Sequence, residues 1–152
     1  MRKNYYAYGS NLNIYQMHHR CPTAEVVGYG FIEGYRLVFK GSGTGAYLTI
    51  EPHDGSRVPV GVYSVTEQDE VSLDRYEGYP RFYRKERRII RVRDEHGEEM
   101  RDGFLYIMNW NKVYGIPTQE YVDICMEGYD DFCFDRVILE DAVRRAHGRK
   151  RD

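Results

Sequence analysis

The chain has 152 residues, a length that fits a single domain around one hydrophobic core. Its 22 basic and 24 acidic side chains leave a net charge of -2, which gives no overall attraction to nucleic acid or to an anionic membrane. No apolar run approaches the ~20 residues needed to cross a bilayer, and no apolar signal core follows Met1. We therefore expect a cytoplasmic protein.

The cysteine and tyrosine contents bound the chemistry further. Cys21, Cys125 and Cys133 form neither an even disulfide set nor a C-x-x-C metal or redox spacing, so we expect reduced thiols. Cys21 lies near His18 and His19, but sequence proximity is not the spatial pairing that a thiol nucleophile needs. The 15 tyrosines suit a barrel core and a polar ligand pocket equally well, and composition does not choose between these uses.

The first predicted element is an aromatic strand that ends in a turn of small residues. Tyr5, Tyr6 and Tyr8 are β-formers, and residues 9–11, Gly-Ser-Asn, form a turn that can expose backbone N–H groups. Such a turn can aim successive amides at a carboxylate or a developing oxyanion. An ordinary surface turn is built in the same way, so the residues alone leave both interpretations open.

Strands dominate the chain as far as residue 65. A short helix over residues 13–19 closes before Cys21 and Pro22, because the residue that precedes proline is biased out of the helical region. The glycine-rich loop 41–45 lacks a following Lys-Ser/Thr and is not a phosphate loop. Strands are expected over residues 24–31, 35–40, 46–51 and 58–65, with a turn at 32–34 between the first two.

Helices and one hairpin make up the second half. Thr66 and the acidic residues after it form an N-cap pattern, which predicts a helix of about three turns that Gly78 ends. Paired strands are expected over residues 82–92 and 103–108 with a polar turn at 94–98, followed by helices over 118–127, stopped by Gly128, and from Asp135 onward.

This order of elements predicts a closed or nearly closed mixed sheet that carries peripheral helices. We find no internal repeat and no linker. Residues 1–147 are expected to form one domain, and residues 148–152 a frayed basic tail.

Several separated segments resemble the gamma-glutamylcyclotransferase-like enzymes. They are residues 8–12 (Tyr-Gly-Ser-Asn-Leu), 33–39 (Glu-Gly-Tyr-Arg-Leu-Val-Phe), 72–78 (Ser-Leu-Asp-Arg-Tyr-Glu-Gly) and 117–121 (Pro-Thr-Gln-Glu-Tyr). The segments run in the family's order and span most of the chain. The resemblance implies an α+β fold, a small twisted mixed β-barrel with peripheral helices. It implies no metal and no cofactor.

The resemblance also implies an activity, the conversion of a γ-glutamyl compound to 5-oxoproline with release of an amine. In this reaction the substrate's own α-amine attacks its γ-carbonyl, and a carboxylate must move the protons. The family's general acid/base falls on Glu77, at a predicted helix C-terminus where the helix dipole disfavours a carboxylate. From the residues alone, a solvated helix-end side chain is the favoured interpretation of Glu77, because most carboxylates are exposed, and the resemblance reverses this preference.

The predicted substrate contacts come from the first strand and its turn and from two later tyrosines. Tyr121 matches a substrate-contacting tyrosine of the family, although Ile124 and Cys125 share its helical face and make a core role an open alternative. Tyr83 falls near a further pocket aromatic. The full set is Tyr5, Tyr6, Ala7, Tyr8, Gly9, Ser10, Asn11, Leu12, Tyr83 and Tyr121.

A different class of function rests on the basic stretch 81–93. Such a surface with nearby aromatics would suit a non-catalytic barrel that binds a small molecule or single-stranded nucleic acid. Glu86 and strand alternation divide these charges between two faces, so we favour a solvated strand. We expect a small γ-glutamyl compound as the partner, no nucleic acid and no membrane, and we leave a homodimer open. The sequence does not identify the group attached to the γ-glutamyl moiety.

Overall fold

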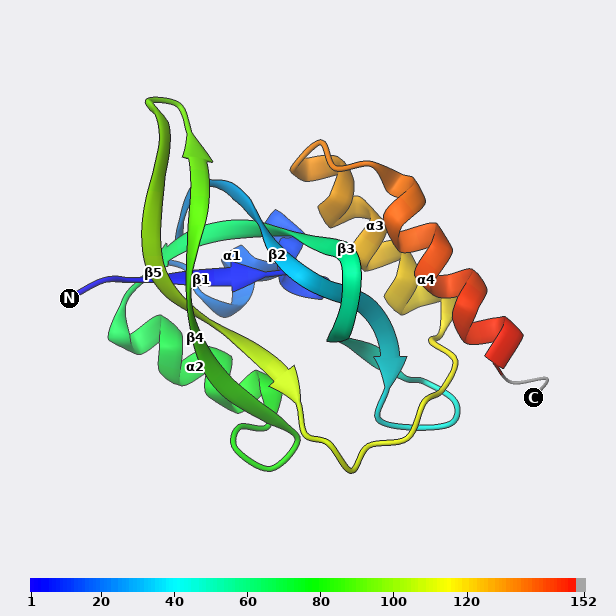
Figure 1. The fold of residues 1–152 in the computed structure, drawn as a ribbon. Helices are drawn as coiled ribbons and strands as arrows, with labels where there is room; N and C mark the ends of the chain where they lie inside the picture. The colour runs from blue at the N-terminus through cyan, green and yellow to red at the C-terminus, as the bar shows by residue number, and fades with distance from the viewer. Residues whose placement is uncertain (150–152) are drawn as a thin grey trace.

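A computed structural model describes residues 1–149, and within these residues the strands close into a barrel in the order β1-β3-β2-β4-β5 (Figure 1). Neighbouring strands are antiparallel except β1 and β5, which run parallel and pair Asn4 with Gly103. The mixed barrel expected from the sequence is confirmed. The strands are β1 (Lys3–Ala7), β2 (Glu25–Lys40), β3 (Tyr47–Val65), β4 (Tyr83–Asp94) and β5 (Gly97–Met108).

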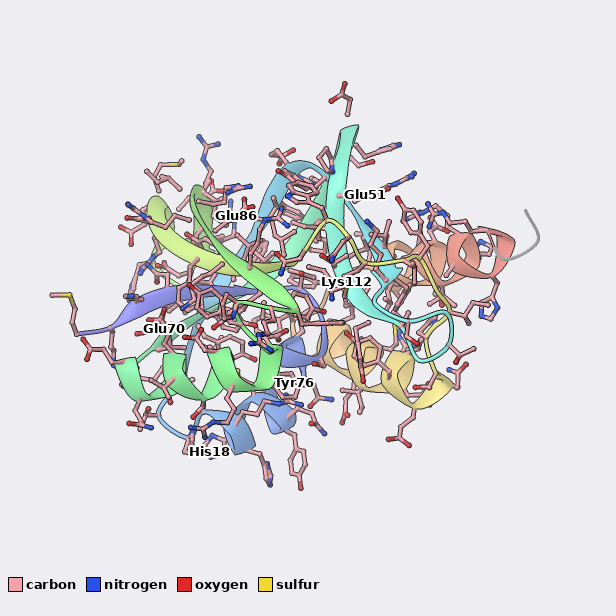
Figure 2. The ribbon with its side chains drawn as sticks, turned by 90° about the horizontal axis from the view of Figure 1, so that it is seen from below. His18, Glu51, Glu70, Tyr76, Glu86 and Lys112 are labelled. Carbon is pink, nitrogen blue, oxygen red and sulfur yellow. The ribbon has the colours of Figure 1, made fainter. Side chains whose placement is uncertain are left out.

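Helices surround this barrel. They are the 3₁₀ turn η1 (Ser10–Leu12), α1 (Ile14–Arg20), α2 (Glu67–Glu77), α3 (Gln119–Asp131) and α4 (Arg136–Arg149). The helices α3 and α4 lie together on one side (Figure 1). There α4 packs on β2, and α3 packs on η1. In the view from below, α1 and α2 lie side by side, marked by His18 and Tyr76 (Figure 2). Among the helices of residues 1–149, none combines the length and apolar character that a bilayer crossing requires.

Strand alternation builds the core and sets the direction of the first strand's side chains. Val58, Val60 and Val62 of β3 alternate along one face and are fully buried, each contributing about 1.5–3 kcal/mol relative to an exposed position. In β1 the same alternation separates Tyr5 from Tyr6. The ring of Tyr6 lies over Gly103, where an added Cβ would come within 2.5 Å of Tyr6 Cζ.

The strands of the first half are longer than expected. The predicted turn at residues 32–34 is wrong, because β2 runs without a break from Glu25 to Lys40. Its pairing with β3 shifts register between Glu33 and Tyr35, where Gly34 adopts a φ of 79°. A bulge of this kind bends a strand without ending it, and the same glycine signals a turn in a sequence. Likewise β3 continues through residues 52–57.

Gly128 does not stop α3, contrary to expectation, and the helix continues to Asp131. An added Cβ at Gly128 would lie 2.5 Å from the amide nitrogen of Asn13 and 2.6 Å from the carbonyl carbon of Leu12. This glycine therefore lets α3 approach η1 closely. The final helix is also longer than predicted: α4 extends to Arg149, so the expected tail begins inside it, and residues 150–152 lie outside the described residues.

We predict that Gly128→Ala destabilises the protein by about 2 kcal/mol or more, since overpacking outweighs the helix propensity that alanine gains. Chemical denaturation measures the change. Gly148→Ala is the control, because no atom of residues 1–149 lies within 4 Å of a Cβ at that helical position. The control should leave stability unchanged or slightly higher, and an equal effect of both substitutions would contradict the close-approach explanation.

Candidate active site

A cavity of about 200 Å³ opens where the turn after β1 meets the end of α2. Strands β3, β4 and β5 and helix α3 supply the rest of its wall. Its lining is unusually rich in tyrosine and, among residues 1–149, contains one carboxylate, that of Glu77. The lining residues are Tyr5, Tyr8, Gly9, Ser10, Asn11, Tyr47, Leu48, Tyr76, Glu77, Phe82, Tyr83, Tyr106 and Tyr121.

The turn after β1 forms one edge of this cavity. Gly9 precedes η1, and the amide of Leu12 donates to the Gly9 carbonyl at 3.0 Å, which turns the chain sharply after the strand. The hydroxyl of Tyr121 lies 3.4 Å from the point where a Cβ of Gly9 would stand. The hydroxyl of Ser10 lies 3.1 Å from that of Tyr76. The turn is therefore in contact with both α3 and the end of α2.

Helix α2 carries Glu77 as its last residue, and local signals fix both of its ends. At the start, Thr66 and Asp69 form a capping box. At the end, Gly78 adopts the left-handed conformation with φ 66°, and the amide of Tyr79 donates to the carbonyl of Asp74 at 2.9 Å. This closure places the Glu77 carboxylate at the negative end of the helix dipole.

The environment of Glu77 favours its protonated form. Burial among the tyrosines raises the pKa of Glu77 to about 7, and the nearby Arg20 guanidinium opposes this rise. Within residues 1–149, the Glu77 carboxylate forms no hydrogen bond and no ion pair. A carboxylate with a pKa near neutrality can both accept and return a proton, as a general acid/base must.

Helix α2 is tied to the barrel by a cluster of charges. The ammonium group of Lys85 lies 2.6 Å from Glu70 and 2.8 Å from Asp74, both on α2. Lys3 adds a contact to Glu70 at 2.9 Å. Asp74 also accepts a hydrogen bond of 2.6 Å from the Tyr106 hydroxyl, which lines the cavity. The cluster therefore links the helix that carries Glu77 to three strands of the barrel wall.

Several tyrosine hydroxyls of the cavity donate their protons to protein acceptors. Tyr8 donates to the carbonyl of Tyr106 at 2.5 Å, and Tyr83 donates to that of Leu48 at 2.7 Å. Tyr121 instead accepts from the Leu48 amide at 3.1 Å, and its hydroxyl also interacts with the Cys125 thiol. Tyr5 accepts from the side-chain amide of Asn11 at 3.0 Å. The cavity wall thus offers both lone pairs and protons at fixed positions.

The structure brings most of the predicted site residues together. Tyr6, Ala7 and Leu12 lie outside the cavity lining: Tyr6 faces the opposite side of β1 from Tyr5, and Ala7 and Leu12 are buried in the core. The catalytic and binding roles assigned to the lining residues stay predictions. The lining residues that sequence analysis missed are Tyr47, Leu48, Tyr76, Phe82 and Tyr106, of which Tyr76 and Phe82 adjoin predicted residues.

Other candidate chemistries find less support. Within residues 1–149 no three His, Cys, Asp or Glu side chains are grouped as metal ligands. Burial raises the pKa of Cys21 to about 12, which disfavours a thiolate nucleophile. On β4, Arg84 and Arg88 share Glu86, and Arg87 pairs with Asp102. A larger hollow of about 620 Å³ between β2 and β4 contains none of the predicted site residues.

Comparisons with known proteins agree with this fold. The family model described as gamma-glutamyl cyclotransferase, AIG2-like, matches residues 5–124. A solved gamma-glutamyl cyclotransferase superposes with a TM-score of 0.79 at 23% identity, covering 93% of this chain and 86% of its own. An uncharacterised protein from Homo sapiens superposes equally well at 25% identity with the same coverage. No curated protein sequence matches.

YkqA from Bacillus subtilis also shares the fold, with a TM-score of 0.73 at 20% identity over 96% of this chain, which spans about half of that protein (54%). Since the family model covers most of its length, the chain belongs to the gamma-glutamyl cyclotransferase, AIG2-like family. The family resemblance drawn from the short motifs is confirmed. This places the protein among gamma-glutamyl cyclotransferase-like proteins.

The raised pKa of Glu77 predicts a pH-dependent stability difference. The folded state holds the proton of Glu77 more tightly than the unfolded chain does. The protein's free energy of unfolding therefore falls as the pH rises from about 4.5 to about 7. Glu77→Gln removes that loss. Between pH 5 and pH 8, the free energy of unfolding of Glu77→Gln should therefore rise by about 2 kcal/mol relative to the wild type.

Denaturant titrations at the two pH values give this difference. The exposed Glu140 supplies the control, since Glu140→Gln should track the wild type at both pH values. A Glu77→Gln variant that also tracks the wild type would show that the cavity does not disfavour the carboxylate.

Proposed function

We propose that this protein is a gamma-glutamyl cyclotransferase that converts a γ-glutamyl amino acid or amine to 5-oxoproline and a free amine. The observation that carries the proposal is the placement of Glu77. Among residues 1–149 it is the single carboxylate that lines the tyrosine-rich cavity, Gly9 and Ser10 of the turn line the same cavity, and the pKa of Glu77 is raised to about 7. Family membership supports the same activity.

The reaction needs little more than positioning and proton transfer. The α-amine nitrogen attacks the γ-carbonyl carbon to form the lactam bond, and the bond from that carbon to the leaving nitrogen breaks. Overall the α-ammonium loses two protons and the leaving nitrogen gains two. Glu77 can carry these protons in turn, because its carboxylate accepts one from the ammonium and its acid form returns one to the leaving nitrogen. Holding both groups in one small cavity supplies the proximity advantage of an intramolecular reaction.

The turn after β1 is the proposed binding element for the substrate's negative charge. The amides of Gly9 and Ser10 lie at the start of η1, where the first N–H groups of a helix have no acceptor within it. They can bind the α-carboxylate or support the oxyanion that develops on the γ-carbonyl oxygen. Gly9 keeps this edge open, because a longer side chain there would grow toward the Tyr121 hydroxyl.

Glu77→Gln should lower turnover by about 10²–10⁴-fold while substrate still binds, because glutamine keeps the shape but cannot accept the ammonium proton. Single-turnover formation of 5-oxoproline from a panel of γ-glutamyl compounds measures the loss. Glu67→Gln, on the exposed start of the same helix, is the matched control and should be fully active. Near-normal turnover by a folded Glu77→Gln variant would remove Glu77 from the mechanism.

The pH profile of kcat/KM offers an independent check. The reaction requires ionised Glu77 in the free enzyme, so kcat/KM should fall about tenfold per pH unit below pH 7, the pKa that burial gives this side chain. A profile that stays flat down to pH 5 would mean that no group with a pKa near 7 accepts the proton.

The proposal also includes a cytoplasmic location and one catalytic domain over residues 1–147. The free thiols Cys21, Cys125 and Cys133 suit a reducing compartment. The competing idea of a nucleic-acid-binding barrel makes a different prediction. It requires salt-sensitive retention of a single-stranded oligonucleotide and no release of 5-oxoproline.

A further inference from the structure

Three side chains at the edge of the cavity form a continuous chain of hydrogen bonds. The guanidinium of Arg20 on α1 donates to Oδ1 of Asn11 at 2.6 Å. The Nδ2 of Asn11 donates to the hydroxyl of Tyr5 on β1 at 3.0 Å. Asn11 and Tyr5 are only 2% and 4% exposed, so water does not readily replace these contacts.

The chemistry of arginine fixes the direction of this chain. A guanidinium has five N–H donors and no acceptor, so the Asn11 atom that faces Arg20 must be the oxygen. The Asn11 atom that faces Tyr5 is then the NH₂ group, which can only donate. The Tyr5 oxygen therefore accepts a hydrogen bond from Asn11, and its own proton is not used in this contact. Within residues 1–149, no nitrogen or oxygen accepts a hydrogen bond from Tyr5.

Tyr5 differs in this respect from its neighbours in the cavity. Tyr8, Tyr83 and Tyr106 give their protons to two carbonyls and to Asp74. Burial also raises the pKa of Tyr5 well above its ordinary value, and Glu77 adds to the rise, so the hydroxyl stays protonated at neutral pH. A buried donor without an acceptor is unfavourable, and an anionic oxygen is its strongest partner.

We infer that the Tyr5 hydroxyl donates a hydrogen bond to the carboxylate of the bound γ-glutamyl compound, and that Arg20 and Asn11 are positioning residues that set the direction of this proton. This inference rests on the proposed function. The α-carboxylate is the appropriate anion because it carries charge in both substrate and product, and because it shares its carbon with the amine that Glu77 must reach. Tyr5 lies near enough to Glu77 for the carboxylate charge to raise the pKa of Tyr5.

A binding experiment can isolate this hydrogen bond. The probes are 5-oxoproline, which carries the carboxylate, and its neutral primary amide. Calorimetric or NMR titration gives both affinities for each variant. Tyr5→Phe should weaken binding of the carboxylate about 10–100-fold, the usual strength of a hydrogen bond to a charged group, and should change amide binding much less. Equal losses for both probes would overturn the inference.

Asn11→Asp tests the direction of the proton. Aspartate has nearly the same shape as asparagine and can still pair with Arg20, but its second oxygen accepts the proton that Tyr5 would give to the ligand. Carboxylate binding should fall at least as much as in Tyr5→Phe. The effect of the added negative charge on affinity is measured separately, by making Asn11→Asp in the Tyr5→Phe background. There a smaller loss of carboxylate binding is expected. The same loss in both backgrounds would show that charge alone is responsible.

Variants of Arg20 provide a further test, because a merely structural role of Arg20 would not change the preference for carboxylate over amide. Arg20→Met removes the donor that fixes the orientation of the Asn11 side chain, so its oxygen and nitrogen can exchange places. The preference of the protein for 5-oxoproline over its primary amide should then fall about tenfold or more. Arg20→Lys keeps a donor and should preserve much of this preference. Thermal melts of every variant identify any loss of folding, and a preference unchanged in a folded Arg20→Met variant would exclude Arg20 as a positioning residue.

Turnover separates this inference from the proposed function. Carboxylate binding that depends on Tyr5, together with no 5-oxoproline release from any γ-glutamyl compound, would support the inference and reject the enzyme. Normal turnover, together with an unchanged preference for carboxylate over amide in Tyr5→Phe and Asn11→Asp, would support the enzyme and reject the inference. Failure of the wild type to bind 5-oxoproline more tightly than its amide would overturn the inference directly.

Discussion

Burial of a polar turn is the constraint on which the rest of this structure depends. Asn11 and Asn13 are 2% and 1% exposed, and each buried polar group left unpaired would cost about 1–3 kcal/mol. The carbonyl of Asn11 accepts from the Tyr63 hydroxyl at 2.8 Å, and the side chain of Asn13 donates to Glu127 at 2.8 Å. Satisfying these groups requires β3 and α3 to close over the turn, and Gly128 makes that approach sterically possible.

The packing of α2 against the barrel accounts for the acid/base character proposed for Glu77. A carboxylate at an exposed helix end would titrate like any other, so the useful pKa depends on how deeply α2 is held against the cavity. The contacts of Lys85 with Glu70 and Asp74 hold it there, and Tyr106 joins this cluster to the cavity wall. Stability and proposed chemistry therefore share one cause. Arg20 limits the effect, because its positive charge keeps the pKa of Glu77 from rising further.

Sequence rules worked where the relevant physics is local. The ends of α2 were predictable because Thr66 and Gly78 act on backbone groups only a few residues away. The rules failed at Gly34 and Gly128, because a glycine signals a turn, a bulge and a close helix contact in the same way, and only the partner segment decides among them.

The candidate site shows the same division. Motif matching indicated Glu77 and the turn after β1, since each lies within a short contiguous segment. Tyr106 and Arg20 carried no such signal. Tyr106 reaches the cavity only because the barrel closes between β1 and β5, a pairing of strands far apart in the sequence. Arg20 matters because α1 packs beside η1, where its guanidinium reaches Asn11, and beside α2, which carries Glu77. A lone arginine near a helix end predicts neither contact.

The high tyrosine content finds its explanation in this geometry. A cavity lined by phenylalanine would bind no polar ligand, and one lined by charged side chains would be costly to bury. Tyrosine packs its ring into the barrel and still places an oxygen at the cavity surface. The proton of that hydroxyl can face either way, and the neighbouring group decides: a carbonyl draws it out of the cavity at Tyr8 and Tyr83, whereas an amide donor leaves it free at Tyr5. One residue type thus supplies the core and both polarities of the binding surface, which is why composition alone could not distinguish these uses.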